Sequence, residues 1–219
     1  MLPCIQKQLD RIRDNTSYQA SSLAAATAIA TGLLLLVSQL TAPAIAMRQQ
    51  EDQQMALALV MPSERYSNNI LATAKSFRLD GRTYQLFTAF DNGVSAGYVV
   101  ETEADGYAGP IKLMIGLDER LQIIGVRVLS HAETPGLGDK IEVSKHKWIT
   151  SFDGLSLANT GDDKWQVKKD GGQFDQFSGA TITPRAVVRQ VHQTLRDMES
   201  VANQQATEQL SAAEQGASS

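Results

Sequence analysis

The hexapeptide SGATIT, residues 178–183, places small residues between hydroxyl groups directly before a predicted helix. The first backbone N–H groups of a helix lack partners, and the helix dipole adds partial positive charge, so a helix N-terminus binds anions. Gly179 and Ala180 allow a ligand to approach the backbone closely. The stretch therefore suits a phosphate group held beside the hydroxyl of Thr181.

Nearby cations are consistent with an anion site. Arg185 lies in the first turn of the predicted helix, and Lys168 and Lys169 precede the hexapeptide. The alternative is an ordinary strand-to-helix turn, in which Ser178 and Thr183 only cap backbone groups. The hexapeptide alone leaves both interpretations open.

Other residue types argue against metal chemistry and nucleic-acid binding. His131, His146 and His192 are not at metal-ligand spacing. Cys4 is the single cysteine, so we expect no metal site. The net charge of -4, without a concentrated basic face, argues against a nucleic-acid partner. We also expect no catalytic acid or base in this chain.

Two separated blocks of the sequence resemble a known family. The block DQFSGAT, residues 175–181, has the form Asp-x-x-Ser/Thr-Gly-Ala-Thr and resembles the flavinylation motif of FMN-binding domains. The block HAETPGLGDKI, residues 131–141, resembles the loop that accompanies this motif in the G subunit of Rnf- or Rsx-type electron transport complexes. The C subunit of sodium-pumping NADH:quinone reductase is a more distant relative of that protein. The segments 64–66, 105–111 and 165–188 extend the resemblance in the same order.

The resemblance implies a covalently attached cofactor. In this family the last threonine of the motif carries FMN through a phosphoester, and the matching residue here is Thr181. The resemblance also implies that a flavin transferase installs the FMN from FAD. The residues implied to surround the attachment site or line the flavin are Asp175, Ser178, Gly179, Ala180, Glu133, Thr134, Gly136 and Leu137.

Three side chains in this region have more than one interpretation. Leu137 and Trp148 could contact the flavin ring, although burial in the core is the alternative for both. Glu133 could act as a general base, but we favour a loop residue near the flavin. The GLG of this loop follows a proline and lacks the strand–helix context of a dinucleotide-binding fingerprint.

The resemblance further implies a redox subunit and not a stand-alone enzyme. The flavin would carry the electrons, while the protein would supply position and electrostatics. Its partners would be the other subunits of an Rnf/Rsx ion-translocating complex, the flavin transferase and the membrane. A membrane-anchored periplasmic adaptor, with a noncovalent ligand or none, is the alternative.

A long apolar segment near the N-terminus predicts a membrane anchor. Residues 21–46 contain no charged residue, and this run exceeds the ~20 residues that cross about 30 Å of hydrocarbon. Lys7, Arg11 and Arg13 precede it, which predicts a cytoplasmic N-terminus and a periplasmic main domain at a bacterial inner membrane. The AIA at 44–46 also fits a cleavage site, but the run is longer than a signal core of about 7–15 residues. We therefore favour a retained anchor.

The remaining elements alternate between strands and helices. Apolar alternation predicts strands at 83–90, 94–102, 111–117 and 121–129, with an Asn-Gly turn between the first two. A short helix is predicted over 141–152, and a strand, an Asp-Gly-Gly turn and a return over 164–177.

The last predicted helix has the clearest pattern. Thr183 followed by Pro184 predicts an N-cap and the first helical position. Its apolar stripe consists of Val187, Val191, Leu195 and Met198.

We therefore predict an α+β protein with a single N-terminal transmembrane helix and an extracytoplasmic FMN-binding domain that has an antiparallel sheet and flanking helices. The predicted organisation is a cytoplasmic N-terminus (1–20), the transmembrane helix (21–46), a periplasmic stalk (47–78), the FMN-binding domain (79–201) and a disordered tail (202–219).

Overall fold

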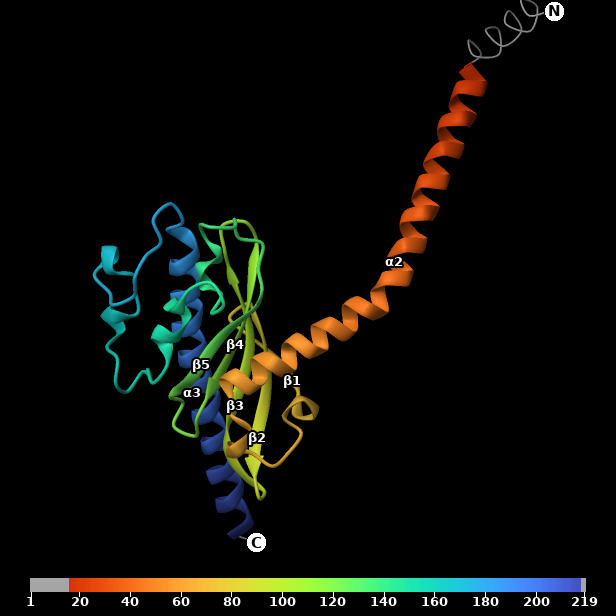
Figure 1. The fold of residues 1–219 in the computed structure, drawn as a ribbon. Coiled ribbons are helices and arrows are strands. Elements are labelled where there is room, and N and C mark those ends of the chain that lie inside the picture. The colour runs from red at the N-terminus through yellow and green to blue at the C-terminus, as the bar shows by residue number, and fades with distance from the viewer. Residues whose placement is uncertain (1–15, 218–219) are drawn as a thin grey trace, which may run out of the picture. The chain divides into compact units, whose positions relative to one another are not determined.

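The computed structural model describes residues 16–217 (Figure 1). The chain divides into two compact units between Glu51 and Asp52, within helix α2 (Thr16–Val60). Within the described part of the chain, α2 is the one helix long and apolar enough to cross a membrane, with a mean hydropathy of 2.0 over its most apolar window. The predicted anchor at 21–46 lies inside this helix.

Helix α2 continues well past the predicted anchor. It ends at Val60, and Pro62 follows shortly afterwards, as predicted from the inability of proline to continue a helix. The basic residues on which the topology prediction depends, Lys7, Arg11 and Arg13, lie outside the described residues.

A five-stranded antiparallel sheet forms the centre of the second unit. Its strands lie side by side in chain order, as a meander. They are β1 (Lys75–Leu79), β2 (Arg82–Asp91), β3 (Val94–Asp105), β4 (Pro110–Leu117) and β5 (Ile123–Ser130). Four of the strands were predicted; the edge strand β1 was not. The predicted Asn-Gly turn joins β2 to β3, with positive φ angles of 49° at Asn92 and 84° at Gly93.

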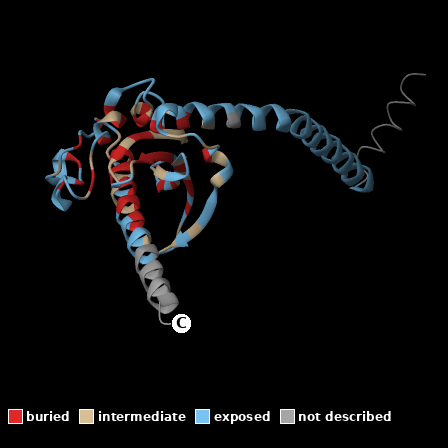
Figure 2. Ribbon diagram, turned by 90° about the horizontal axis from the view of Figure 1, so that it is seen from below, coloured by how far each residue is buried: buried red, intermediate tan, exposed pale blue. Residues whose placement is uncertain are grey.

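Helix α3 (Ile182–Ala217) packs along one face of this sheet (Figure 1). The predicted stripe of Val187, Val191, Leu195 and Met198 is buried in the main core. Figure 2 shows this buried side as a red stripe on the helix next to the sheet. Full burial of each such side chain contributes about 1.5–3 kcal/mol, so the stripe fixes the helix firmly on the sheet.

The last turns of α2 cover the opposite face of the sheet. Ala56, Leu57 and Val60 are buried there together with Phe87 and Met114 from the strands. Two short 3-10 helices, η1 (Ser63–Arg65) and η2 (Ile70–Thr73), then connect α2 to β1. Residues 52–78 of the segment that we expected to be a stalk therefore belong to the second unit.

Two paired glycines allow the end of α2 to approach the sheet. Gly116 on β4 lies opposite Gly125 on β5. A Cβ atom on Gly116 would overlap the backbone carbonyl of Val60, and one on Gly125 would lie 3.2 Å from the carbonyl oxygen of Leu59. The backbone of α2 therefore rests directly on the backbone of the sheet.

The segment between β5 and α3 is built from turns. It contains the 3-10 helices η3 (Asp139–Ile141), η4 (Lys147–Phe152), η5 (Asp162–Lys164) and η6 (Lys168–Asp170). The predicted α-helix over 141–152 is therefore wrong. The first half of this segment consists mainly of turns, and the second half is the 3-10 helix η4. The predicted strand pair over 164–177 is also wrong, because only an isolated bridge joins Val167 to Phe174.

Aromatic packing explains why this segment is ordered without regular strands. Trp148 contacts both Phe152 and Phe177 edge to face, with ring centroids 5.5 and 5.1 Å apart. Phe152 also stacks on Phe174, with centroids 4.5 Å apart. Trp148 is therefore buried in the core, which was the alternative to contact with the flavin ring.

The C-terminal segment differs from the expected disordered tail. Helix α3 continues through residues 202–217. The segment is rich in Ala, Gln and Glu, which are good helix formers, so the helix continues beyond its apolar stripe.

Gly116→Ala should lower the free energy of unfolding by about 1–3 kcal/mol, because its Cβ would push against the backbone of Val60. Gly125→Ala is the matched control, since the nearest atom there leaves more room, and it should cost less. Urea unfolding of the full chain in detergent, followed by tryptophan fluorescence, measures both. Equal stability of the two variants would contradict the close contact of α2 with the sheet.

Candidate functional site

The carboxylate of Glu133 joins three segments that lie far apart in the sequence. Its Oε1 accepts hydrogen bonds from the backbone N–H groups of Tyr107 and Ala108, at 2.8 and 3.2 Å. Its Oε2 accepts a hydrogen bond from the hydroxyl of Thr183, at 2.6 Å. Glu133 is only 5% exposed. The β3–β4 loop, the 131–138 loop and the start of α3 are therefore bonded together at one buried side chain.

Two glycines leave room for this carboxylate. A Cβ atom on Gly106 would overlap Glu133 Oε1. A Cβ atom on Gly138 would lie 2.7 Å from Glu133 Oε2 and 3.0 Å from Thr183 Oγ1. Larger residues at either position would separate the segments that Glu133 holds together.

The predicted role of Thr183 as the helix N-cap is wrong. Helix α3 begins at Ile182, so Thr181 immediately precedes the first helical residue. Thr183 lies inside the first turn, is fully buried and donates its hydroxyl hydrogen to Glu133. This partner is 50 residues away in the sequence, so no local pattern indicates it.

The residues of the predicted attachment motif form a tight turn before α3. The backbone N–H of Ala180 donates to the carbonyl of Phe177 at 3.3 Å, and Gly179 has a φ of +83°, which favours glycine. Ser178 and Gly179 are exposed, while Ala180 and Thr181 are partly exposed. Thr181 is therefore partly exposed, whereas Thr183 is fully buried.

The 131–138 loop reaches this turn. The backbone N–H groups of Leu137 and Gly138 both donate to the carbonyl of Thr134 at 3.1 Å. A Cβ atom on Gly179 would lie 3.3 Å from Cδ2 of Leu137, so the two motif blocks contact each other. Gly136 has a φ of +78° and open space in the direction of a Cβ atom.

Exposed apolar side chains lie on each of the three joined segments. They are Tyr107 (71% exposed), Leu137 (42%) and Ile182 (48%). Leu137 is thus not buried in the core. Tyr107 and Ile182 were not predicted as site residues, although an aromatic residue in a glycine-rich loop is an indicative signal. Each of the three segments that Glu133 joins therefore presents one exposed apolar side chain.

Two of the three cations expected to face a phosphate, Arg185 and Lys168, are paired with carboxylates. Arg185 donates two hydrogen bonds to Asp170, at 2.6 and 2.9 Å, and these bonds hold the pKa of Asp170 below its ordinary value. Lys168 bonds to the exposed side chain of Asp175 at 2.6 Å. The backbone carbonyl of Asp175 accepts a hydrogen bond from Trp148 Nε1 at 2.8 Å. The site therefore offers less free positive charge than its sequence suggests.

A second hydrogen-bond network stabilises the 131–138 loop. The Glu133 N–H donates to His131 Nδ1 at 3.0 Å, so Nε2 carries the proton that bonds Glu142 Oε1 at 2.8 Å. Burial opposes ionisation of Glu142, but hydrogen bonds from His131 and Lys145 lower its pKa below the ordinary value. The backbone N–H of Gly136, followed by the ammonium of Lys145, likewise lowers the pKa of Asp139.

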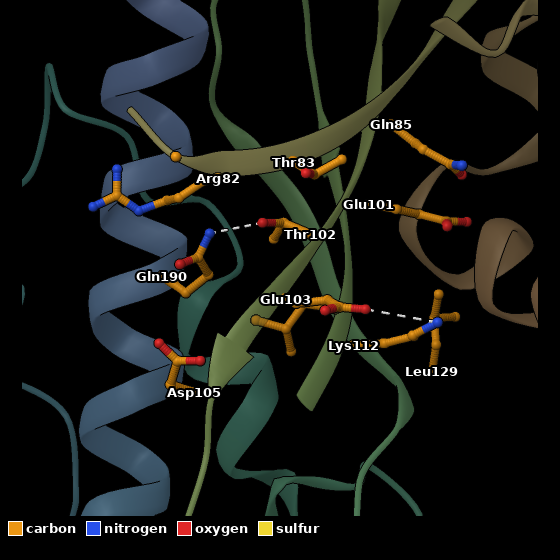
Figure 3. Close-up of a pocket in the computed structure, with 12 residues that line it drawn as sticks. Arg82, Thr83, Gln85, Glu101, Thr102, Glu103, Asp105, Lys112, Leu129 and Gln190 are labelled. Atoms are coloured by element: carbon orange, nitrogen blue, oxygen red, sulfur yellow. Dashed lines mark hydrogen bonds and ion pairs between the residues drawn. The ribbon is translucent and has the colours of Figure 1, made fainter. Parts of the chain in front are cut away.

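A polar cavity elsewhere in the domain does not include the predicted residues. It has a volume of about 440 Å³ and is lined by residues of strands β2 to β5 and helix α3 (Figure 3). Gln190 donates to Thr102 at 2.7 Å inside it, and Lys112 pairs with Glu103 at 3.7 Å.

In the part of the chain that the structure describes, no three His, Cys, Asp or Glu residues are grouped to hold a metal ion.

Comparison with known proteins gives two kinds of match. The FMN-binding domain family matches residues 106–196, which include the three segments joined by Glu133. A protein of Stutzerimonas stutzeri, named as the G subunit of an ion-translocating oxidoreductase complex, is 47% identical over 84% of this chain and 81% of its own length. Proteins of the same name from Shewanella piezotolerans and Haemophilus influenzae are 45% and 44% identical, over 74% and 84% of this chain and 80% and 88% of their own lengths.

Proposed function

Because the chain belongs to the family of G subunits of ion-translocating oxidoreductase complexes and contains an FMN-binding domain, we propose that it carries electrons through an FMN attached to Thr181 by a phosphoester. The observation that carries this proposal is the contact between the two motif blocks beside an accessible Thr181. The other subunits of such a complex are its partners.

The residues around Thr181 fit an FMN molecule. The phosphate end would lie at Thr181, where the first N–H groups of α3 lack helical partners. The exposed apolar side chains of Tyr107, Leu137 and Ile182 would contact the ring. Gly136 leaves its backbone open to close approach. Bound FMN supplies reversible electron transfer, and these residues supply its position.

The pairing of two nearby cations with aspartates is compatible with a cofactor that a covalent bond retains. Arg185 and Lys168 each bond an aspartate, so a phosphate would compete with these carboxylates for the two cations. A phosphoester retains the cofactor without free cations and leaves the ring chemically unmodified.

Attachment requires transfer of an FMN unit onto the Thr181 hydroxyl. A flavin transferase would take this unit from FAD: the new bond joins Thr181 Oγ1 to phosphorus, AMP leaves, and the hydroxyl proton is released. The magnesium ion of this reaction would belong to the transferase. The exposed side chains of Asp175 and Ser178 place the motif where such an enzyme can reach it.

Thr181→Ala should abolish covalent flavin while the fold is kept, since a partly exposed hydroxyl contributes little to stability. The measurement is in-gel fluorescence of the denatured full chain, co-expressed with a flavin transferase, with circular dichroism to check the fold. Thr150→Ala is the matched control, because Thr150 is also a partly exposed threonine but lies outside both motif blocks, and it should remain fluorescent. Flavin that persists in Thr181→Ala, or an FMN mass mapped to Ser178, would disprove the assignment. Absence of flavin from the unmodified chain would favour the adaptor function.

Gly136→Leu should reduce flavin incorporation or shift the flavin absorbance, because a side chain would fill the open space in front of the loop. Gly154→Leu is the matched control. Gly154 also has a positive φ, +80°, and open space around it, but it lies outside the site. Equal flavin content and identical spectra for the two variants would argue against contact between this loop and the ring.

We also propose that α2 is a retained anchor with its N-terminus in the cytoplasm and the FMN-binding domain in the periplasm. The support is the apolar run at 21–46 with basic residues before it. Protease added to spheroplasts should digest the domain and leave a protected N-terminal fragment. A mature chain that begins at residue 47 would refute the anchor, although not the location of the domain.

A further inference from the structure

Glu133 differs from the neighbouring carboxylates in having no cation beside it. Its three hydrogen-bond donors are two backbone N–H groups and one hydroxyl, none of them charged. Within the described part of the chain, no ion pair includes Glu133. By contrast, a lysine or arginine pairs with each of Asp139, Glu142, Asp170 and Asp175. The site therefore contains a buried negative charge that is held by dipoles alone.

This charge is bonded to the segment that carries the proposed attachment residue. Glu133 Oε2 bonds Thr183, which is two residues from Thr181 in the first turn of α3. The loop that carries Glu133 also contacts Gly179 through Leu137. Because the carboxylate is buried, solvent and salt screen its field weakly on the protein side.

We propose that the negative charge of Glu133 acts on the group attached at Thr181 and lowers the reduction potential of the flavin. Each electron added to the flavin adds negative charge, and a fixed carboxylate nearby opposes it. The inference rests on the proposed function, because it concerns an FMN at Thr181. It assigns Glu133 an electrostatic role in addition to joining the three segments.

Two nearly isosteric substitutions separate the charge from the hydrogen bonds. Glu133→Gln removes the charge but can keep all three bonds, since its carbonyl accepts from Tyr107 and Ala108 and its amide donates to the Thr183 hydroxyl. Thr183→Val removes one hydrogen bond but keeps the charge. Thr183→Ser retains both the charge of Glu133 and the hydrogen bond to it, and it therefore reports on the loss of the methyl group alone.

The first measurement is the flavin midpoint potential of the flavinylated full chain. Glu133→Gln should shift the potential upward, while Thr183→Val and Thr183→Ser should leave it close to that of the unmodified chain. No shift in Glu133→Gln would overturn the proposal. Equal shifts in Glu133→Gln and Thr183→Val would also overturn it, because hydrogen bonding and not charge would then be responsible.

A second measurement needs no flavin. Thr181→Cys in a Cys4→Ser background places a single titratable thiol at the attachment position, and iodoacetamide labelling against pH gives its ionisation midpoint. The carboxylate disfavours the thiolate, so adding Glu133→Gln should lower this midpoint, whereas adding Thr183→Val should not. An unchanged midpoint with Glu133→Gln would overturn the electrostatic role. Since this assay is independent of FMN, it distinguishes failure of this inference from failure of the proposed attachment.

Discussion

The arrangement of the site depends on one buried carboxylate. A carboxylate withdrawn from water without a cation is costly unless several donors satisfy it. In this protein the donors come from the β3–β4 loop and from the first turn of α3, while Glu133 itself belongs to the loop after β5. If any one segment moves away, an unsatisfied charge remains inside the protein. The β4–β5 pairing already sets the first two segments side by side, and Glu133 bonds the start of α3 to them, so the three segments are held as one surface.

The sheet and the helices supply the rigid support for this surface. Helix α3 is fixed on one face by its buried apolar stripe, so its N-terminus stays in a constant place beside the loops. The end of α2 packs on the other face, where Gly116 and Gly125 allow close contact between backbones. Both faces of the sheet are therefore covered. The loops at the ends of the strands do not contribute to this cover and can carry functional residues.

Patterns of apolar residues predicted the strands and the stripe of α3, because burial imposes a period on regular elements. The edge strand β1 escaped prediction, since only Phe77 and Leu79 are partly buried in it. The 3-10 segments escaped prediction because aromatic contacts between residues such as Trp148 and Phe177 hold them, and no period is involved. The predicted site motifs do lie together. The hydrogen bond of Thr183 to Glu133 could not be predicted from the neighbouring sequence, because the two residues are 50 positions apart.

Thr181 and Thr183 differ in their exposure, and under the proposed attachment this difference bears on when the cofactor would be added. In an unfolded chain, Ser178, Thr181 and Thr183 would all present hydroxyls to a modifying enzyme. Folding removes Thr183 from this choice by burying it against Glu133, while Thr181 stays accessible. A transferase that acts after folding would therefore face fewer wrong acceptors than one that acts on the nascent chain. The fold itself would provide part of the fidelity of cofactor loading.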